Sequence, residues 1–289
     1  MYTLEKKPQK DYNFIKLDDY VHVPERMKIK ETATIISQEC LCRGVYSMWL
    51  ETNAAKYASP GQFISVYPNS DSMMLPRPIS ICEIDNGNVP GKLRIVYRIA
   101  GRGTELFSRM KAGERMEILG PVGNGFLLAA SGKIHPETRA LLVGGGIGIP
   151  PMLELAKQLK CDVTTVAGYR SSEDMFLTKE LESSGRLYIA TDDGSFGTSG
   201  TVIDAIEENA VDFDIAFACG PRPMLRGIKV LCEERGVPAY VSMEERMACG
   251  VGVCLGCVCE TSETDEHSKV NNKRVCVDGP VFSASEVVL

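Results

Sequence analysis

The first part of the chain has the hydrophobic pattern of a series of short strands. Apolar and polar residues alternate in runs that Gly, Pro or Asn separate, and this spacing is typical of an antiparallel barrel. The runs are KETATIISQECLCRGVYSMWLET, QFISVYP, PISICEI, KLRIVYRI and RMEILGP. We therefore predict an antiparallel β-barrel domain over residues 29–133.

The next part changes to apolar runs of strand length that alternate with amphipathic stretches of helix length. The strand candidates are ALLVGG, VTTVAGY, RLYIAT, IAFACG and AYVSM. The helix candidates between them are PPMLELAKQLK, residues 175–182, TVIDAIEENA and PMLRGIKVLCEERG. This alternation is typical of a parallel sheet with helices on both faces. We predict an α/β domain over residues 134–242, with its boundary in the polar segment SGKIHPET.

The two ends of the chain follow neither pattern. Residues 1–28 are polar and of mixed charge, so we expect an N-terminal extension. Residues 243–289 are rich in Gly and Cys and show little helical periodicity, so we expect a small C-terminal domain. The predicted fold class is a multi-domain β plus α/β chain, with a barrel, a parallel-sheet domain and a small third domain.

Composition narrows the possible functions. The 289 residues are 44% hydrophobic and 24% charged, which is ordinary for a folded chain and excludes disorder. The net charge of −6 disfavours nucleic acid as a partner, because that affinity depends on Lys and Arg. No apolar run reaches the roughly 18 residues of a membrane span, and the N-terminus has no apolar signal segment. We expect a cytoplasmic protein that binds neither nucleic acid nor membrane.

The cysteines show the most specific pattern. Eleven are present, and three of them follow the spacing C-x4-C-x2-C. With a fourth cysteine further on, this is the spacing of plant-type [2Fe–2S] sites, in which four thiolates hold two irons. Glycines between the cysteines suit a loop that wraps a cluster, because they expose backbone N–H groups. The predicted metal ligands are Cys249, Cys254, Cys257 and Cys276.

A zinc site and plain buried thiols are the alternatives at these cysteines. Zinc sites usually carry two C-x2-C-like pairs a dozen or more residues apart, and only one such pair is present. A secreted disulfide scaffold would be much shorter and would carry a signal peptide. Cys259 breaks the cluster spacing and is left out of the ligand set.

A second group of motifs lies in the predicted barrel. RPIS is followed by VYR and then by GRGT, and together they offer arginines, hydroxyls and a tight glycine turn. A flavin dinucleotide needs such groups for its pyrophosphate and its ring. Structural turns and surface charge are the alternative, because these short motifs occur in many barrels. The residues concerned are Arg77, Pro78, Ile79, Ser80, Val96, Tyr97, Arg98, Gly103 and Thr104.

A third group lies at the ends of two predicted parallel strands. The glycine-rich turn GGGIGIPP stands between a strand and a helix, where a pyrophosphate can approach the helix N-terminus. It lacks the G-x-G-x-x-G spacing, so a plain tight turn is the alternative. CGP ends the fourth strand, at the edge where open α/β sheets bind ligands. The candidate residues are Gly144, Gly145, Gly146, Gly148, Cys219, Gly220 and Pro221.

These motifs, in this order, resemble the ferredoxin–NADP reductase superfamily. Within it, MEERMACGVGVCLGCVCE and VCVDGPVF resemble the electron-transfer subunits of NAD-dependent, type B dihydroorotate dehydrogenases. RPISI, the YR and GRGT segments, GGGIGIPP, TDDGSFGTSG and CGPRPML match that family's pattern in order. The resemblance covers about residues 29–289 and leaves the first 28 residues without a counterpart.

The resemblance implies three cofactor sites and a partner. The barrel would hold FAD through residues 77–80, 96–98, 103 and 104, the α/β domain would bind NAD, and the four cysteines would hold a [2Fe–2S] cluster. The partner would be an FMN-containing dihydroorotate dehydrogenase catalytic subunit of pyrimidine biosynthesis, in a heterotetramer of two plus two subunits.

These expectations combine into a relay. Nicotinamide accepts a hydride whereas a [2Fe–2S] cluster passes single electrons, so a flavin between them connects the two kinds of chemistry. We expect electrons to pass from the partner's FMN to the cluster, to FAD and then to NAD+, with no catalytic acid or base supplied by this chain. Two alternatives are a stand-alone NAD(P)H reductase that feeds a ferredoxin or an oxygenase, and a non-enzymatic redox sensor.

Overall fold

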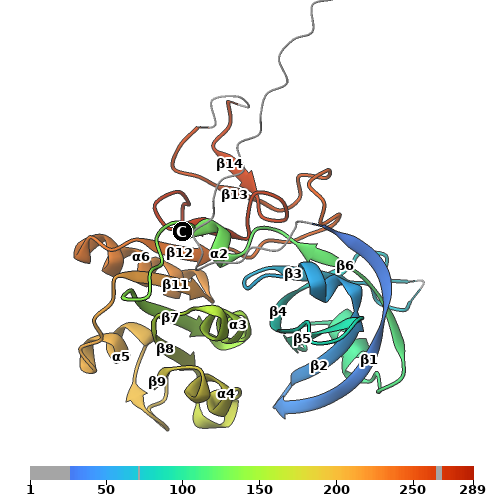
Figure 1. Cartoon of the computed structure of the whole chain (residues 1–289), viewed down its shortest axis with the longest axis horizontal. Coiled ribbons are helices and arrows are strands. Elements are labelled where there is room, and N and C mark those ends of the chain that lie inside the picture. The colour runs from blue at the N-terminus through green and yellow to red at the C-terminus, as the bar shows by residue number, and fades with distance from the viewer. Residues whose placement is uncertain (1–26, 71, 265–268) are drawn as a thin grey trace, which may run out of the picture.

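Six antiparallel strands close into a barrel in the first part of the chain (Figure 1). The computed structural model describes residues 27–70, 72–264 and 269–289, so residues 1–26 of the predicted extension lie outside the described residues. The strand order is β1-β2-β5-β4-β3-β6, which confirms the predicted barrel. The strands are β1 (Ile29–Cys42), β2 (Val45–Thr52), β3 (Phe63–Val66), β4 (Arg77–Asp85), β5 (Gly91–Arg98) and β6 (Arg115–Val122).

The barrel forms because alternate residues of each strand point inward. Ile35, Met48, Leu50 and Ile95 are fully buried inside it. The long run predicted after residue 29 becomes two strands, because Gly44 takes a left-handed φ of +74° and turns the chain back. Left-handed φ values favour glycine, so this turn follows from the sequence.

Beside the barrel lies a seven-stranded sheet in the order β10-β9-β8-β7-β11-β12-β15 (Figure 1). Its first six strands are parallel, as predicted. They are β7 (Arg139–Gly145), β8 (Asp162–Tyr169), β9 (Arg186–Thr191), β10 (Thr198–Ser199), β11 (Ile215–Cys219) and β12 (Ala239–Ser242). The helices are α1 (Arg102–Ser108), α2 (Phe126–Ala129), α3 (Pro150–Gln158), α4 (Thr178–Ser183), α5 (Val202–Glu208) and α6 (Arg222–Arg235), with 3-10 turns at η1 (Asn53–Tyr57), η2 (Gly146–Gly148) and η3 (Ser172–Asp174).

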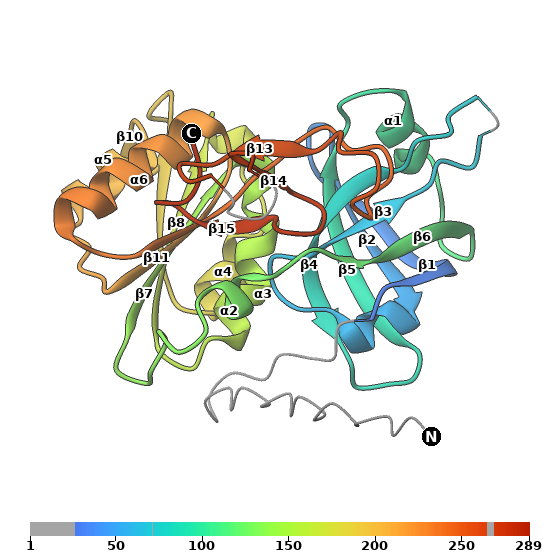
Figure 2. The same cartoon turned by 90° about the horizontal axis from the view of Figure 1, so that it is seen from above.

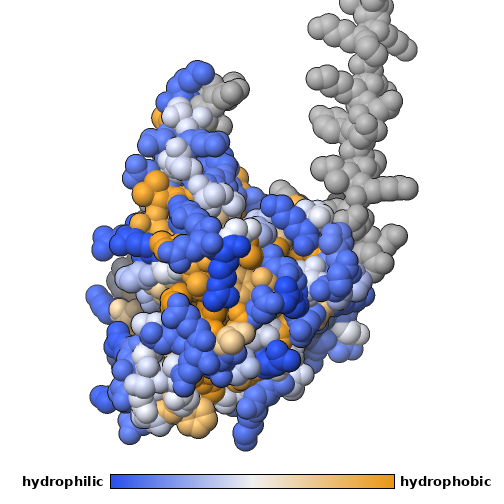
Figure 3. Space-filling view, turned by 90° about the vertical axis from the view of Figure 1, so that its left-hand side faces the viewer, coloured by the Kyte–Doolittle hydropathy of each residue, from blue (hydrophilic) through white to orange (hydrophobic). Residues whose placement is uncertain are grey.

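Helices cover both faces of this sheet because its central strands are apolar on both sides. Leu141 and Val143 of β7 share one core with residues of α5 and α6. Ala140 and Leu142, which alternate with them, share another core with residues of α2 and α3. The side that carries α5 and α6 is mostly hydrophilic on its surface, with apolar residues between the polar ones (Figure 3).

One predicted helix starts later than its pattern indicated. We predicted a helix over residues 175–182, whereas α4 spans Thr178–Ser183. Met175 is extended and Leu177 takes a left-handed φ of 60°, so the chain cannot be helical before Thr178. Tyr169 accounts for this local shape, since its hydroxyl donates a hydrogen bond to the Phe176 carbonyl at 2.6 Å.

The last segment of the chain connects the barrel and the sheet. A short hairpin of β13 (Val258–Glu260) and β14 (Asn272–Arg274) is followed by β15 (Val281–Ser283), which pairs antiparallel with β12. This segment runs across the junction of the two larger units (Figure 2). The C-terminal segment therefore shares the sheet, and the domain boundaries after residues 133 and 242 stay predictions. No helix in the described part of the chain is long and apolar enough to cross a membrane.

Replacing Phe217 by Ala should destabilise the sheet strongly. Phe217 is fully buried, with its ring centroid 5.7 Å from that of Phe126 and 5.8 Å from that of Tyr240. Phe-to-Ala changes in cores cost about 3–5 kcal/mol. We expect the free energy of unfolding to fall by this amount in urea unfolding followed by circular dichroism. For Phe196→Ala we expect a fall below about 1 kcal/mol, since Phe196 is half-exposed. Equal effects of the two changes would contradict this account of the core.

Candidate functional site

The residues predicted to bind a flavin border a break in the barrel. Strands β4 and β5 pair from Asp85 opposite Lys92 to Ile81 opposite Ile95. Beyond these positions, residues 77–80 pair with β3 and residues 96–98 pair with β2. The two predicted segments, residues 77–80 and 96–98, are therefore the ends of β4 and β5 at which these two strands no longer pair with each other. The edges that face one another there make no β4–β5 pairing, so their backbone groups can serve a planar ring.

The Arg77 guanidinium lies over the turn that begins α1. A Cβ atom at Gly103 would lie 2.6 Å from Nε and 2.8 Å from Cζ of Arg77. Arg77 also donates a hydrogen bond to the Leu75 carbonyl at 2.6 Å. Because residue 103 is glycine, the Arg77 guanidinium can lie directly against the backbone of the turn that begins α1. Such a combination suits a pyrophosphate, which takes charge-assisted hydrogen bonds and backbone N–H groups together.

Two of the predicted flavin residues use their side chains inside the protein. The Thr104 hydroxyl accepts a hydrogen bond from the Ala100 N–H at 2.9 Å and donates one to the Gly101 carbonyl at 3.0 Å. The Tyr97 ring is buried in the barrel, and its hydroxyl donates to Gln38 at 2.8 Å. Burial also raises the pKa of Tyr97. Thr104 therefore shapes the turn, and Tyr97 offers a ligand its backbone only.

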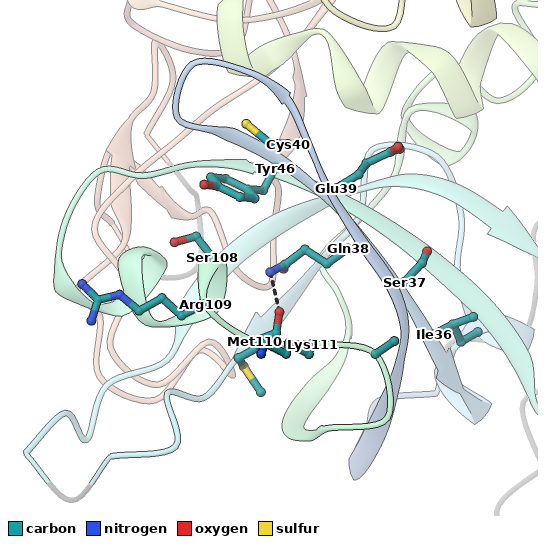
Figure 4. Close-up of a pocket in the computed structure, with 11 residues that line it drawn as sticks. Ile36, Ser37, Gln38, Glu39, Cys40, Tyr46, Ser108, Arg109, Met110 and Lys111 are labelled. Atoms are coloured by element: carbon teal, nitrogen blue, oxygen red, sulfur yellow. Dashed lines mark hydrogen bonds between the residues drawn. The ribbon is translucent and has the colours of Figure 1, made fainter.

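Gln38 is a positioning residue that the sequence analysis missed. Its amide donates a hydrogen bond to the Phe107 carbonyl at 3.0 Å. It donates another to the Met110 carbonyl at 2.8 Å, which Figure 4 shows. These bonds tie the end of α1 to β1 beside a cavity of about 450 Å³. None of the predicted site residues lines this cavity. No local sequence pattern indicates this role of Gln38, because its two hydrogen-bond partners lie 69 and 72 residues away along the chain.

The two glycine-rich segments of the sheet come together at its carboxyl edge. Cys219 at the end of β11 is the register partner of Gly144 in β7. A Cβ atom at Gly148 would lie 2.2 Å from the Cys219 carbonyl oxygen, and one at Gly145 would lie 2.6 Å from Met224 Sδ. A Cβ atom at Gly146, by contrast, would meet nothing within 4 Å. The glycine turn is therefore packed on one side and open on the other, as a nucleotide-binding turn requires.

The Cys219 thiol stays protonated at this edge. Burial raises its pKa to about 12. A neutral thiol is a poor nucleophile and a poor metal ligand. Cys219 thus contributes its backbone and its bulk to the predicted nucleotide site.

The cysteine loop provides hydrogen bonds to sulfur. The Cys249 sulfur accepts from the backbone N–H groups of Val251 and Cys254, each at 3.4 Å, and the Cys254 sulfur accepts from Gly256 at 3.4 Å. Burial opposes ionisation of Cys249, but these donors outweigh it and lower its pKa to about 6. The loop therefore stabilises a thiolate, the form of cysteine that binds metal.

The four predicted ligands influence one another's ionisation. Cys254 helps to lower the pKa of Cys249, and Cys257 and Cys249 help to raise that of Cys276. Among the described residues, no three His, Cys, Asp or Glu side chains converge on one point that a single metal ion could occupy. The predicted ligand set therefore rests on the cysteine spacing, which is that of plant-type [2Fe–2S] sites.

Long-range contacts hold this loop in place. The Asn124 amide donates to the carbonyls of Val277 at 3.2 Å and Asp278 at 2.9 Å. The Asp278 carboxylate accepts two hydrogen bonds from the Arg274 guanidinium, at 3.0 and 3.1 Å. Asn124 is a second residue that the sequence analysis missed, since its partners lie 153 and 154 residues away. It anchors the segment that carries Cys276.

The cysteine loop lies against β3, the strand that pairs with the predicted flavin segment of β4. A Cβ atom at Gly250 would lie 2.9 Å from Ser65 Oγ of β3, and Ser65 is the register partner of Pro78 in β4. Figure 2 shows this loop beside the barrel. One strand therefore separates the predicted cluster ligands from the predicted flavin residues.

Cys259 lies in β13, two residues after Cys257. It is buried, and burial raises its pKa to about 11. Cys276 is also buried and its pKa is also raised, so the spacing along the chain remains the ground for leaving Cys259 out of the predicted ligand set.

Replacing Gly103 by Ala should weaken FAD binding without unfolding the barrel. The added methyl group would displace the flexible Arg77 side chain, so we expect an affinity for FAD about tenfold lower, the value of one charge-assisted hydrogen bond. Gly101→Ala is the matched control, because a Cβ atom there meets nothing within 4 Å. Fluorescence titration of FAD into the flavin-free chain measures both. Unchanged affinity in Gly103→Ala would exclude Arg77 from the flavin site.

Iron-free protein should show one unusually reactive cysteine in the loop. With a pKa near 6, Cys249 is a thiolate at pH 7, whereas Cys276, whose pKa burial and Cys257 raise to about 12, is protonated. Iodoacetamide should modify Cys249 first, with a rate that rises through about pH 6 and then levels off. Mass spectrometry of the modified peptides reports the order. Faster modification of Cys276 would contradict this distribution of charge.

Two parts of the chain match known protein families. Residues 244–288 match the family described as the iron-sulfur cluster binding domain of dihydroorotate dehydrogenase B. Residues 142–229 match the oxidoreductase NAD-binding domain. These ranges contain the cysteine loop and the glycine-rich sheet edge respectively.

Curated relatives match nearly the whole chain. The dihydroorotate dehydrogenase B (NAD(+)), electron transfer subunit, of Geobacillus thermodenitrificans is 44% identical over 266 residues, which cover 90% of this chain and 99% of the relative. The protein of the same name from Listeria innocua is 40% identical over 259 residues, which cover 88% and 97%.

Solved structures agree on the fold. The NADH-dependent reduced ferredoxin-NADP oxidoreductase gives a TM-score of 0.77 at 30% identity, over 89% of each chain. A ferredoxin NADP+ reductase from Neisseria gonorrhoeae with bound FAD and NADP gives 0.60 at 17% identity, over 75% of this chain and 94% of that one. By its identity to full-length relatives, this chain belongs to the family of electron transfer subunits of dihydroorotate dehydrogenase B (NAD(+)).

Proposed function

We propose that this chain delivers electrons to NAD+ from a partner catalytic subunit that oxidises dihydroorotate to orotate, with a [2Fe–2S] cluster and FAD as its cofactors. The observation that carries this proposal is the order of the sites in space. The cysteine loop lies on β3, and β3 pairs with the predicted flavin segment of β4. Ile149, which follows the glycine-rich turn, shares a buried cluster with Val96 of the same barrel. Close, ordered sites are what successive electron transfers require.

The residues at each site fit the group assigned to it. Arg77 and the turn at Gly103 form a cationic cradle for the pyrophosphate of FAD, and the separated edges of β4 and β5 can hold its ring. When bound, FAD would connect the one-electron chemistry of a cluster with the two-electron chemistry of NAD+. In this proposal, the open side of Gly146 receives the NAD pyrophosphate, and the packed glycines around it set its position.

The cysteine loop also fits its cofactor. Cys249, Cys254, Cys257 and Cys276 would hold the cluster. Backbone N–H groups already point at two of these sulfurs, and such donors tune the reduction potential of iron–sulfur sites. A metal ion deprotonates a coordinating thiol, which would offset the raised pKa of Cys276.

Exposed apolar side chains around the cysteine loop support a partner subunit. Val253 is 80% exposed and Leu255 is 60% exposed, with Val251 and Val258 partly exposed beside them. Neighbouring apolar side chains on a surface mark protein interaction sites. Their place beside the predicted cluster is where an electron-donating subunit has to bind. We assign this surface to the catalytic subunit.

Assembly and location are part of the same proposal. We infer a heterotetramer of two catalytic and two electron-transfer subunits. The compartment we infer is the cytoplasm. All eleven cysteines are free in the structure, which suits the reducing conditions there.

A stand-alone reductase is the second candidate function. The likeness to the NADH-dependent reduced ferredoxin-NADP oxidoreductase favours it, because that protein shares the fold over 89% of each chain. In this role the same cofactors would pass electrons from NAD(P)H to a ferredoxin or an oxygenase. The cysteine loop would then serve as the exit for electrons.

Replacing Cys254 by Ser should block electron flow from dihydroorotate to NAD+ in the complex with the catalytic subunit, while FAD remains bound. The change removes one predicted cluster ligand and leaves the barrel untouched. NADH formation at 340 nm measures the flow, and the flavin absorbance measures FAD content. Cys40→Ser, at an exposed cysteine outside the site, is the control and should be fully active.

The outcomes separate the two candidate functions. A Cys254→Ser complex that reduces NAD+ at the normal rate would rule out the relay. A wild-type chain that reduces ferredoxin with NADH, but takes no electrons from any dihydroorotate-oxidising subunit, would establish the stand-alone reductase instead.

A further inference from the structure

Two elements that begin at the predicted cofactor sites continue side by side at the boundary between barrel and sheet. Strand β4 begins with the predicted flavin residues, and helix α3 follows the glycine-rich turn. Further along both, the Ile84 N–H of β4 donates to Glu154 Oε2 of α3 at 2.8 Å, and Gln158 donates to the other oxygen at 2.7 Å. The spacing of β4 and α3 therefore determines the spacing of the two sites.

One carboxylate connects the two units directly. Glu83 of β4 accepts from Arg94 of β5 through Oε2 at 2.6 Å, and from Lys157 of α3 through Oε1. The side chains of Arg94 and Glu83 are only 7% and 12% exposed. Separating such groups leaves buried charges unpaired, which is strongly unfavourable. Opening between β4 and α3 would leave the Arg94–Glu83 pair intact but would take the buried Glu83 carboxylate from two cationic partners to one.

Arg94 makes a second connection across the boundary. Besides Glu83, its guanidinium contacts Ser47 and Glu39 of the barrel, at 2.8 and 3.5 Å, and Glu180 of α4 at 3.4 Å. Two elements of the α/β unit, α3 and α4, are therefore held by charges that converge on β4 and β5.

An apolar contact lies beside this charged group. Val45, Cys82 and Val96 of the barrel share one buried cluster with Ile149 and Leu153 at the start of α3. Apolar packing holds surfaces together but is not directional, whereas charged hydrogen bonds have a defined geometry. The apolar cluster therefore holds the barrel and α3 together, and the charged groups determine how the two are oriented.

We propose that Glu83, Arg94, Lys157 and Glu154 form an inter-domain clamp that sets the distance between the flavin ring and the nicotinamide. This inference rests on the proposed function, because it concerns the step in which a hydride passes between NADH and FAD. Donor and acceptor atoms must come within about 3–3.5 Å, and small misplacements slow such steps sharply. None of the four is among the predicted cofactor-binding residues, so we assign them a positioning role.

The test compares Lys157→Met with a matched change. Lys157 is partly exposed and its removal leaves the buried Arg94–Glu83 pair intact, so the fold should survive. The control is Lys92→Met, which removes an ion pair with Asp85 that lies within the barrel, at 3.8 Å. Lys157→Arg keeps the positive charge and should restore wild-type behaviour.

Two readouts are needed, and one of them requires no cofactor. In the flavin-free chain, hydrogen exchange at the Ile84 amide should be faster in Lys157→Met than in wild type or Lys92→Met. In the loaded chain, stopped-flow reduction of FAD by NADH should show a limiting rate about tenfold lower, with an unchanged Kd for NADH. Glu180→Gln, which weakens the second connection, should change both readouts in the same direction but less.

Three results would overturn the clamp. These are unchanged Ile84 exchange in Lys157→Met, an equal loss of rate in Lys92→Met, or a loss that Lys157→Arg does not restore. If NADH cannot reduce the FAD bound to the wild-type chain, that result would instead contradict the proposed function. The Ile84 exchange would still decide whether the clamp exists.

Discussion

The contact between the cysteine loop and strand β3 is the constraint on which the arrangement of sites depends. Gly250 lies so close to Ser65 that a Cβ atom would be 2.9 Å from the hydroxyl, and its φ of +67° favours glycine. A larger residue at this position would force either the Ser65 hydroxyl or the loop to shift. Since β3 pairs with β4, this one close approach determines how far the predicted cluster lies from the predicted flavin.

The last segment of the chain makes this contact rigid. It adds β15 to the edge of the parallel sheet, and Asn124, between the barrel and the sheet, binds its backbone. Barrel, sheet and cysteine loop are thus joined at three places. Electron transfer between fixed sites benefits from such a frame, because no rearrangement has to precede each transfer.

The surroundings of each cysteine determine whether its thiol ionises. At Cys249 the N–H donors outweigh burial and favour the thiolate, whereas at Cys219 and Cys259 burial outweighs the donors and the thiols stay protonated. Residue type alone cannot distinguish them. The same principle separates Tyr97 and Thr104, whose polar groups are used internally, from Arg77, whose guanidinium lies at the open turn.

The sequence by itself determined the barrel, the parallel sheet and the three motif groups, because alternation, helical period and glycine turns are local properties. The cysteine spacing is also local, so the predicted ligands could be named without a structure. The roles of Gln38 and Asn124, the pairing of Glu83 with Lys157 and the late start of α4 were decided only by the tertiary structure. Each depends on partners brought together by folding, such as a carbonyl 154 residues away or an ion pair across 74 residues. Side-chain hydrogen bonds of this kind leave no periodic trace in a sequence, since their partners are set by packing and not by spacing along the chain.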